Sequence, residues 1–203
     1  MAPGKPGPRA LYEGRNHVDY QLAVIDPPWS WAAWGKEQSR EVPYPVLTLS
    51  DLQALSISSL LAPDAVVLLW VTDPLLPHAM RCVEAWGLTF KTVGFYWTKT
   101  RASGKEHIGL GYYTRANPEQ CWILTRGKGL PRQSRAVRRW LQAPFTKHSE
   151  KPDQFYEAVE QLFGPVKRVD VFARKLRPGW HSLGNEIDGR DIRDVIPNAG
   201  SIV

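Results

Sequence analysis

The fold is decided by the stretch YQLAVIDPPW, residues 20–29. Its first six residues are mostly apolar, as expected for a buried β-strand. Pro27 and Pro28 lack the amide hydrogen that a sheet ladder needs, so the strand must end where they begin. The stretch therefore predicts a strand that presents Asp26 and Trp29 at its carboxyl end.

Further strands are expected later in the sequence, at residues 65–71, 89–98, 119–125 and 168–172. The first of these, AVVLLWV, is apolar throughout, which is typical of a strand buried on both faces of a parallel sheet.

Helices are expected between the strands: one over about residues 50–61 with Ser50 as its N-cap, one over residues 74–86, and one from Pro152 to Gly164. In the second of them Leu76, Ala79, Met80 and Val83 repeat at helical spacing. Alternation of strands and helices predicts the α/β class, as a three-layer domain with a mostly parallel sheet.

The chain is expected to hold one domain, at residues 19–190, with a flexible leader at 1–18 and a C-terminal tail at 191–203. Residues 99–118 and 126–150 are polar and rich in Gly or Arg. They are expected to be long loops that serve function.

Composition narrows the class of protein. The 203 residues are 43% hydrophobic, which excludes a disordered chain. The sequence has no apolar run of about eighteen residues and no signal-peptide core at its start, so we expect no membrane segment. Cys82 and Cys121 stand apart in apolar surroundings, which favours buried thiols over a disulfide or a zinc site. An intracellular, cytoplasmic protein without a metal is predicted.

The charge distribution points to a polyanion. Lys and Arg number 26 against 20 Asp and Glu, a net charge of +6. Between Arg115 and Lys151 the only acidic residues are Glu119 and Glu150. This basic segment is either a solvated loop and helix face or a surface that contacts nucleic-acid phosphates.

The residues Asp26-Pro27-Pro28-Trp29 have two interpretations. They can form a simple turn whose tryptophan belongs to the core. Alternatively, the Asp26 carboxylate and a main-chain carbonyl fixed by the prolines accept hydrogen bonds from one amino group, and Trp29 stacks on the base that carries it. Such acceptors would stabilise the positive charge that develops when the amino group attacks a methyl sulfonium.

This motif and the blocks that follow it resemble the MT-A-seventy family of adenine methyltransferases. The matching blocks occur in the family's order over roughly residues 20–190, at residues 23–29, 43–45, 50–52, 69–72, 86–87, 97–99, 109–112, 149–153, 170–174 and 180–186. The resemblance implies a Rossmann-like methyltransferase fold that is permuted, so that the catalytic strand precedes the cofactor-binding strand.

The resemblance also implies site residues and S-adenosylmethionine as the cofactor. The residues implied to be catalytic are Asp26, Pro27, Pro28 and Trp29. Those implied to bind the cofactor are Asp26, Lys151, Phe172, Arg174, Asn185 and Glu186. Glu186 departs from the amide of the messenger-RNA enzyme, but a carboxylate also accepts hydrogen bonds from ribose hydroxyls.

For the substrate we expect contacts from Trp29, from Tyr44 (unless it only packs in its Pro-Tyr-Pro turn), and from Arg115, Arg135 and Arg138. The implied reaction is methylation of the 6-amino group of adenine in DNA or RNA, with DNA preferred, in a bacterial or phage-encoded enzyme. Methylation of the cytosine 4-amino group and a catalytically silent nucleic-acid-binding subunit remain alternatives. A homodimer or a helper subunit would supply recognition that so short a chain lacks.

Overall fold

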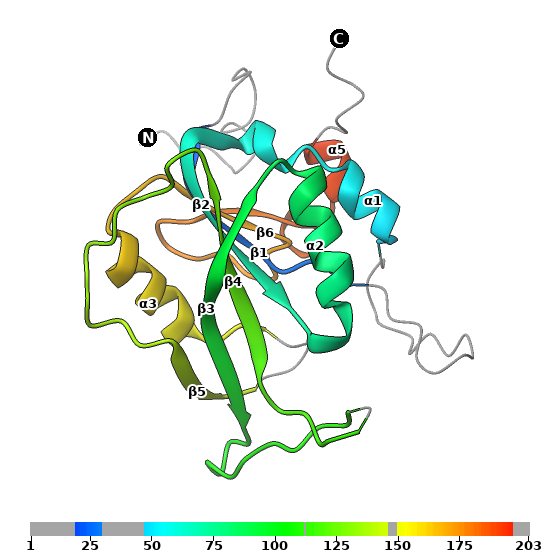
Figure 1. The fold of residues 1–203 in the computed structure, drawn as a ribbon, viewed down its shortest axis with the longest axis vertical. Helices are drawn as coiled ribbons and strands as arrows, with labels where there is room; N and C mark the ends of the chain where they lie inside the picture. Colours follow the sequence, from blue (N-terminus) through cyan, green and yellow to red (C-terminus); the bar gives the residue numbers. More distant parts are fainter. Residues whose placement is uncertain (1–18, 30–46, 112, 146–149, 197–203) are drawn as a thin grey trace, which may run out of the picture.

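One sheet of seven strands organises the molecule. The computed structural model describes residues 19–29, 47–111, 113–145 and 150–196. Within them the strands are ordered β5-β3-β4-β2-β1-β6-β7 (Figure 1). They are β1 (Tyr20–Ile25), β2 (Leu61–Val71), β3 (Thr89–Thr100), β4 (Glu119–Arg126), β5 (Trp140–Pro144), β6 (Arg168–Val171) and β7 (His181–Leu183).

The sheet is mostly parallel. β4 runs antiparallel to both of its neighbours, β2 and β3. The other neighbouring pairs, including β1 with β2 and β1 with β6, are parallel. The α/β class and the mostly parallel, Rossmann-like sheet predicted from the sequence are confirmed.

The helices are α1 (Leu49–Ala54), α2 (Leu76–Ala85), α3 (Asp153–Phe163), α4 (Asn185–Asp188) and α5 (Ile192–Val195), with short 3-10 turns at Ile57–Leu60 and Asp73–Leu75. Buried residues form two clusters. A first core contains residues of α1 and α2, and a second core contains residues of α3.

Alternation along β1 explains its apolar sequence. Ala23 and Ile25 belong to the first core, whereas Leu22 and Val24 belong to the second. Successive side chains of a strand point to opposite faces, so a central strand covered on both sides has no place for a polar residue. The first polar side chain after Leu22 is therefore Asp26, at the carboxyl edge.

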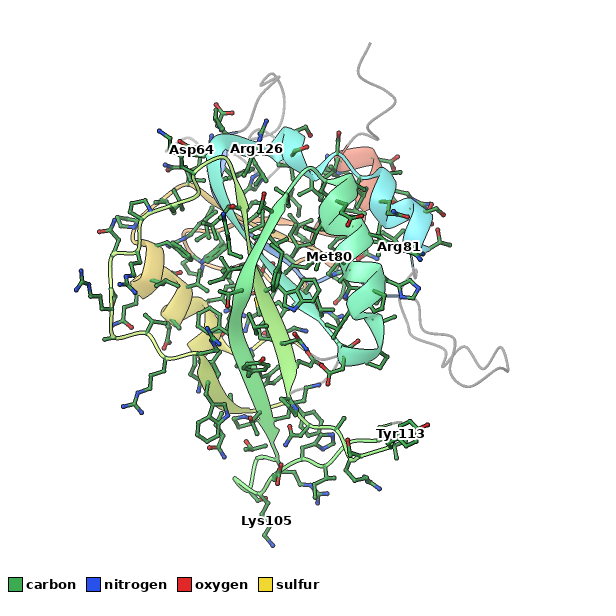
Figure 2. The ribbon with its side chains drawn as sticks, in the orientation of Figure 1. Asp64, Met80, Arg81, Lys105, Tyr113 and Arg126 are labelled. Atoms are coloured by element: carbon green, nitrogen blue, oxygen red, sulfur yellow. The ribbon has the colours of Figure 1, made fainter. Side chains whose placement is uncertain are left out.

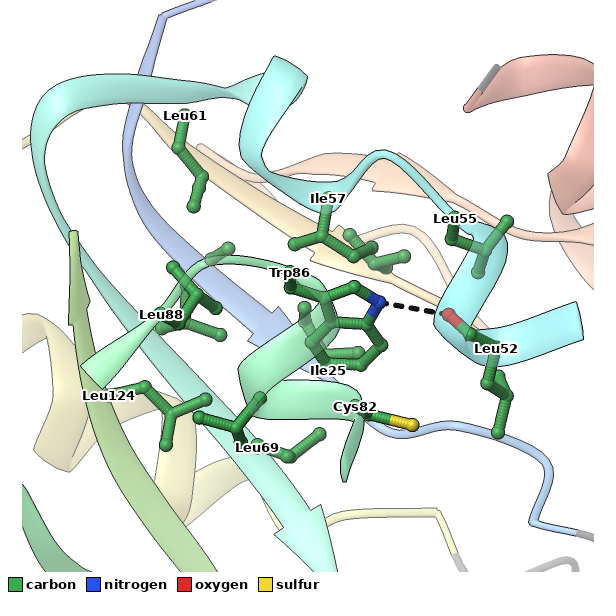
Figure 3. Packing of buried hydrophobic residues seen from close by; sticks show 14 of the residues in the cluster. Ile25, Leu52, Leu55, Ile57, Leu61, Leu69, Cys82, Trp86, Leu88 and Leu124 are labelled. Carbon is green, nitrogen blue, oxygen red and sulfur yellow. Dashed lines mark hydrogen bonds between the residues drawn. The ribbon is translucent and has the colours of Figure 1, made fainter. Parts of the chain in front are cut away.

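Trp86 joins two helices of the first core. It lies at the carboxyl end of α2, is 1% exposed, and its indole N–H donates to the carbonyl of Leu52 in α1 at 2.8 Å (Figure 3). Because the buried indole N–H has a partner, the ring contributes its full apolar area to the core.

The first helix differs from the sequence prediction. It begins after Thr48 rather than Ser50, because Thr48 and Asp51 form a reciprocal capping box: the Asp51 N–H donates to the Thr48 hydroxyl at 3.1 Å and the Thr48 N–H donates to the Asp51 carboxylate at 3.0 Å. It ends at Ala54, and the 3-10 turn takes up the remaining predicted residues. In α2 the side chain of Met80 is 36% exposed, and Cys82 fills the core position instead.

The prediction that residues 126–150 are only a loop is wrong. Residues 140–144 form β5, an edge strand that pairs in parallel with residues 96–100 of β3. A five-residue strand between a basic segment and Pro144 carries little periodic signal, and its pairing to β3 is not visible in the local sequence.

The chain continues to pack after residue 190, where a tail was expected. α5 follows an N-cap at Asp191, and Ile192 and Ile196 are 5% and 0% exposed within the first core. The expected leader and the last seven residues lie outside the described part of the chain. No helix in the described ranges has the length and apolar character needed to cross a bilayer.

Candidate active site

The Asp26 carboxylate lies at the carboxyl edge of the sheet, between β2 and β6. Its backbone N–H still donates to the Val171 carbonyl of β6, at 3.4 Å, and Pro27 then ends the ladder. The position of Asp26 is therefore set by strand pairing on both sides of β1 rather than by a free loop.

Trp29 closes the turn that follows. Its backbone N–H donates to the Pro27 carbonyl at 2.8 Å, and its indole N–H donates to the Trp70 carbonyl near the end of β2, at 3.1 Å. The ring packs partly against the first core. The Pro27 oxygen keeps a second lone pair, since a carbonyl can accept two hydrogen bonds.

A buried ammonium group joins Asp26 to a second carboxylate. The Lys151 Nζ lies 2.9 Å from Asp26 Oδ2 and 3.2 Å from Glu119 Oε2, and its side chain is 5% exposed. Lys99 pairs with the other oxygen of Glu119. Two ammonium groups thus face two carboxylates, so the set is neutral as a whole.

The charges of this set support one another. Burial by itself lowers the pKa of Lys151, but attraction by Asp26 and Glu119 outweighs burial and raises it. Burial likewise raises the pKa of Glu119, yet the ammonium groups of Lys151 and Lys99 bring it down to about 2. Lys151 and Glu119 therefore stay ionised at neutral pH.

One pocket, of about 180 Å³, opens beside Asp26. It is lined by Asp26, Pro28, Leu47, Phe172, Arg174, Asn185, Glu186, Gly189, Asp191 and Ile192. Apolar side chains and polar groups of both charges share the lining. Five of the six residues implied to bind the cofactor meet here, although they come from distant parts of the chain.

A smaller cavity lies on the other side of Asp26. Lys151, the sixth implied cofactor residue, lines it together with Asp26, Tyr156, Asp170 and Arg177. The Tyr156 hydroxyl donates to the Asp170 carboxyl at 2.9 Å, and the Arg177 guanidinium lies 3.6 Å above the Tyr156 ring. Burial raises the pKa of Asp170 to about 7, against the opposing effect of the Tyr156 hydrogen bond.

The turn after β6 forms the boundary between these cavities. Phe172 has φ of 65°, in the left-handed region that residues other than glycine rarely adopt. The Ala173 N–H donates to the Leu183 carbonyl at 2.9 Å, and a Cβ placed on Gly184 would lie 2.5 Å from the Ala173 oxygen. A glycine at position 184 therefore lets the turn pass close enough to β7 to hold Phe172 in the pocket wall.

The expected substrate residues are not gathered in one place. Tyr44 lies outside the described residues. Arg115 lies in the loop after β3, whose projecting part is marked by Lys105 and Tyr113 in Figure 2, and its guanidinium donates to the Gly109 carbonyl at 2.8 Å. Arg135 and Arg138 are in the connection from β4 to β5.

Part of the basic segment is structural. Arg126 lies at the amino edge of the parallel strands (Figure 2), and its guanidinium donates to the carbonyls of Ser58, at 2.7 Å, and Leu61. Arg126 therefore stabilises the turn before β2, and we do not assign it a contact with nucleic-acid phosphates.

Sequence reasoning missed Glu119, Asp170 and Tyr156 as site residues. Asp170 could have been identified from the sequence. A carboxylate between Val169 and Val171 in a buried strand destabilises the fold unless it is hydrogen-bonded or has a function. Glu119 carried none, since it is an ordinary first residue of a strand, and its proximity to Lys151 exists only in the fold. The prediction that both cysteines are buried free thiols is confirmed.

A carboxylate beside an amphiphilic pocket, at the carboxyl edge of a mostly parallel sheet, marks the place where α/β enzymes bind their ligands. The family model MT-A70 matches residues 20–186. A Type II methyltransferase, M.MunI, from Mycoplasma sp is 31% identical over 90% of this chain and 83% of its own length.

Longer relatives match as well. The N(6)-adenosine-methyltransferase MT-A70-like protein of Arabidopsis thaliana is 28% identical over 84% of this chain, and the human N(6)-adenosine-methyltransferase catalytic subunit METTL3 is 25% identical over 86%. The matches cover 24% and 29% of those two proteins. The chain belongs to the MT-A70 family of methyltransferases, whose members generally use S-adenosylmethionine.

Proposed function

We propose that this chain transfers the methyl group of S-adenosylmethionine to the 6-amino group of adenine in nucleic acid, with DNA as the preferred polymer. The observation that carries the proposal is the position of Asp26, which faces both the pocket of Asn185 and Glu186 and the buried ammonium of Lys151. One carboxylate can thus contact a cofactor and a substrate amino group in the same site.

The larger pocket fits the cofactor by the chemistry of its lining. The carboxylates of Glu186 and Asp191 and the amide of Asn185 can accept hydrogen bonds from ribose hydroxyls. Arg174 can hold a carboxylate, and Leu47 and Ile192 offer apolar contact for a purine. When bound, S-adenosylmethionine supplies an electrophilic methyl group on a sulfonium.

At the acceptor side, Asp26 would receive one N–H of the adenine amino group and the Pro27 carbonyl the other, through its second lone pair. Both acceptors are held by backbone hydrogen bonds before substrate arrives, so little reorganisation is needed as positive charge develops on the nitrogen. The amino group is itself the nucleophile, so neither buried cysteine takes part.

Glu119 gives this site a property that a lone Asp–Lys pair lacks. If Asp26 turned to the amino group and Lys151 had no other partner, a buried ammonium would be left uncompensated, which is costly. Glu119 lies 3.2 Å from the same ammonium and can keep Lys151 paired. Asp26 is then free to exchange a hydrogen bond with the substrate.

The choice of polymer rests on sequence identity among the relatives named above. The Type II methyltransferase M.MunI is 31% identical, whereas the proteins named N(6)-adenosine-methyltransferases are 28% and 25% identical. The higher identity to a Type II methyltransferase favours DNA. The names of the longer relatives support the 6-amino group of adenine.

The test is transfer of label. The protein is incubated with labelled S-adenosylmethionine and DNA or RNA of mixed sequence, the polymer is digested, and the modified nucleoside is identified. Label in 6-methyladenine from DNA is expected, and Asp26→Asn, which keeps the size of the side chain, should abolish it. Label in 4-methylcytosine would replace the proposed base. Tight cofactor binding without transfer to any polymer would favour a silent binding subunit.

A further inference from the structure

Two aromatic side chains lie next to each other on a part of the sheet that no helix of the described residues covers. Trp140 of β5 is paired in register with Tyr96 of β3, and directly paired residues point to the same face. Phe95 and Trp97 are buried in the second core, so Tyr96 lies on the opposite face. Tyr96 is 37% exposed and Trp140 63%, and Figure 1 shows that α2 leaves the length of β3 in view.

The Trp140 ring is held in place. Its indole N–H donates to the Thr98 hydroxyl at 2.6 Å, across the strand pair. The backbone next to it is fixed as well, since the Tyr96 N–H donates to the Arg139 carbonyl at 2.8 Å. An exposed ring that is already ordered loses little entropy when it stacks on a ligand.

The charge of the segment that leads to Trp140 suits a polyanion. No Asp or Glu occurs between Glu119 and Glu150 in the sequence, and the exposed Arg138 and Arg139 directly precede Trp140. In a symmetric dimer through this face, the same basic segments would lie near each other and repel. Phosphates neutralise the arginines, while flat bases match the exposed rings.

The rings are also at the level of the active site. Tyr96 pairs with Gln120, Gln120 pairs with Val71, and Ile25 pairs with Leu69, so Tyr96 and Trp140 are close to the level of Asp26 along the strands. Four strand spacings of about 4.8 Å separate β5 from β1, so Trp140 is about 19 Å from the β1 end. A nucleic-acid strand that delivers a base to Asp26 can reach this distance within the usual footprint of a single-strand site, roughly 4–16 nucleotides.

We propose that Tyr96 and Trp140 form a stacking face for unpaired bases that flank the target adenine, with Arg138 and Arg139 on the adjoining phosphates. The proposal rests on the proposed function for the identity of the base at Asp26. Sheet faces with paired aromatics use this principle to bind single strands, because every base has a flat face and stacking tolerates any sequence.

The experiment measures binding of a fluorescent single-stranded DNA of about 16 nucleotides to the full chain, by anisotropy and without methyl transfer. Trp140→Leu and Tyr96→Leu should each weaken binding roughly 5- to 100-fold. Trp140→Phe keeps a flat ring without the Thr98 hydrogen bond and should stay close to wild type. Phe90→Leu, a similarly exposed aromatic at the other end of β3, should change nothing. A strand with abasic positions beside the adenine should bind wild type and Trp140→Leu equally.

A second measurement uses the unaltered protein. Strands with 5-iodouracil beside the adenine should form photo-crosslinks to the peptides that contain Tyr96 or Trp140. Wild-type affinity in both leucine variants, or crosslinks that all lie elsewhere, would overturn the stacking face. A dimer that Trp140→Leu converts to monomer, with unchanged DNA binding, would assign the face to a second copy of the chain. Absence of methyl transfer would remove the proposed function and leave this result unaffected.

Discussion

The Lys151 ammonium lies between two carboxylates, 2.9 Å from Asp26 and 3.2 Å from Glu119, with only 5% of its side chain exposed. In so dry a place an ammonium needs compensation at all times. We propose that Lys151 is a positioning residue, which holds Asp26 at the pocket until substrate competes for the same oxygen. The free energy of unfolding and the rate of methyl transfer should therefore both depend on Lys151. Two variants can distinguish these effects.

Lys151→Met should lower the free energy of unfolding by about 3–5 kcal/mol, because it leaves Asp26 and Glu119 without a shared cation. Urea unfolding at neutral pH measures the change. Methyl transfer should fall as well, since Asp26 loses the partner that holds it.

The double variant Lys151→Met/Glu119→Gln provides the control. Removing the second carboxylate restores the charge balance of the set, in which Lys99 and Asp26 remain, so it should restore part of the lost stability. It should not restore transfer. Recovery of both would mean that Lys151 acts only through stability, and recovery of neither would mean that the two residues are not energetically coupled.

The lowered pKa of Glu119 predicts that the folded protein loses stability in acid. Its pKa falls from 4.5 to about 2 in the folded protein, mainly because Lys151 and Lys99 outweigh burial. A carboxyl with a lowered folded pKa contributes stability above its unfolded pKa and loses it as the pH falls through the folded value. Its contribution, at most about 3 kcal/mol, should be complete above pH 4.5 and disappear toward pH 2. Urea unfolding between pH 6 and pH 3 should show this slope, and Glu119→Gln should flatten it.

The raised pKa of Asp170 predicts the opposite trend, a loss of stability as the pH rises. Burial raises its pKa from 3.8 to about 7. Between these values the folded protein holds a proton that the unfolded chain has released, so stability falls as the pH rises from about 4 to 7 and then levels off. Asp170→Asn keeps an acceptor for Tyr156 and cannot ionise, so it should gain stability over wild type across this window. A stability difference that does not change with pH would show that Asp170 does not titrate there.

Much of the architecture could be predicted because it is local. β1 and β2 are apolar on both faces, and the prolines after Asp26 mark the end of β1. β5 and β7 could not be predicted in the same way, because strands of five and three residues owe their existence to the neighbours with which they pair. α5 was missed because four residues carry too little periodicity, although Ile192 and Ile196 are core residues.

The residues of the candidate site also differ in whether the local sequence predicts them. Asp26, Asn185 and Glu186 were found through ordered sequence blocks, and the fold brings them to one pocket. Glu119 was not predicted as a site residue. It matters because it forms an ion pair with Lys151, which is 32 residues away in the sequence (151 − 119), and the residues next to Glu119 give no sign of that contact. Pairs that form only through tertiary packing need the structure.

Gly184 should be sensitive to the smallest substitution. A Cβ there would lie 2.5 Å from the Ala173 oxygen and 2.9 Å from its nitrogen, both backbone atoms that cannot move alone. Gly184→Ala should therefore shift the turn that holds Phe172 in the pocket wall. We expect weaker binding of S-adenosylhomocysteine by calorimetry, about tenfold or more, with a stability loss of about 1–3 kcal/mol. Gly87→Ala provides the control, because a Cβ there meets open space, φ is 66°, and the residue lies outside the pocket lining, so it should change stability without changing cofactor binding.

Arg138 and Arg135 should differ in their effect on nucleic-acid binding. Arg138 lies two residues before Trp140, at the stacking face. Arg135 lies close to Gln133, whose N–H donates at 2.7 Å to Leu162 near the end of α3, which is the end farther from Asp26. Loss of one phosphate contact to a single strand lowers the slope of log affinity against log salt by about 0.7. Arg138→Glu should flatten the slope by at least this amount, and Arg135→Glu should change it less, as measured by anisotropy titrations at several salt concentrations. Equal effects would mean that the strand runs along the whole connection from β4 to β5, and an unchanged slope in both variants would remove that connection from the interface.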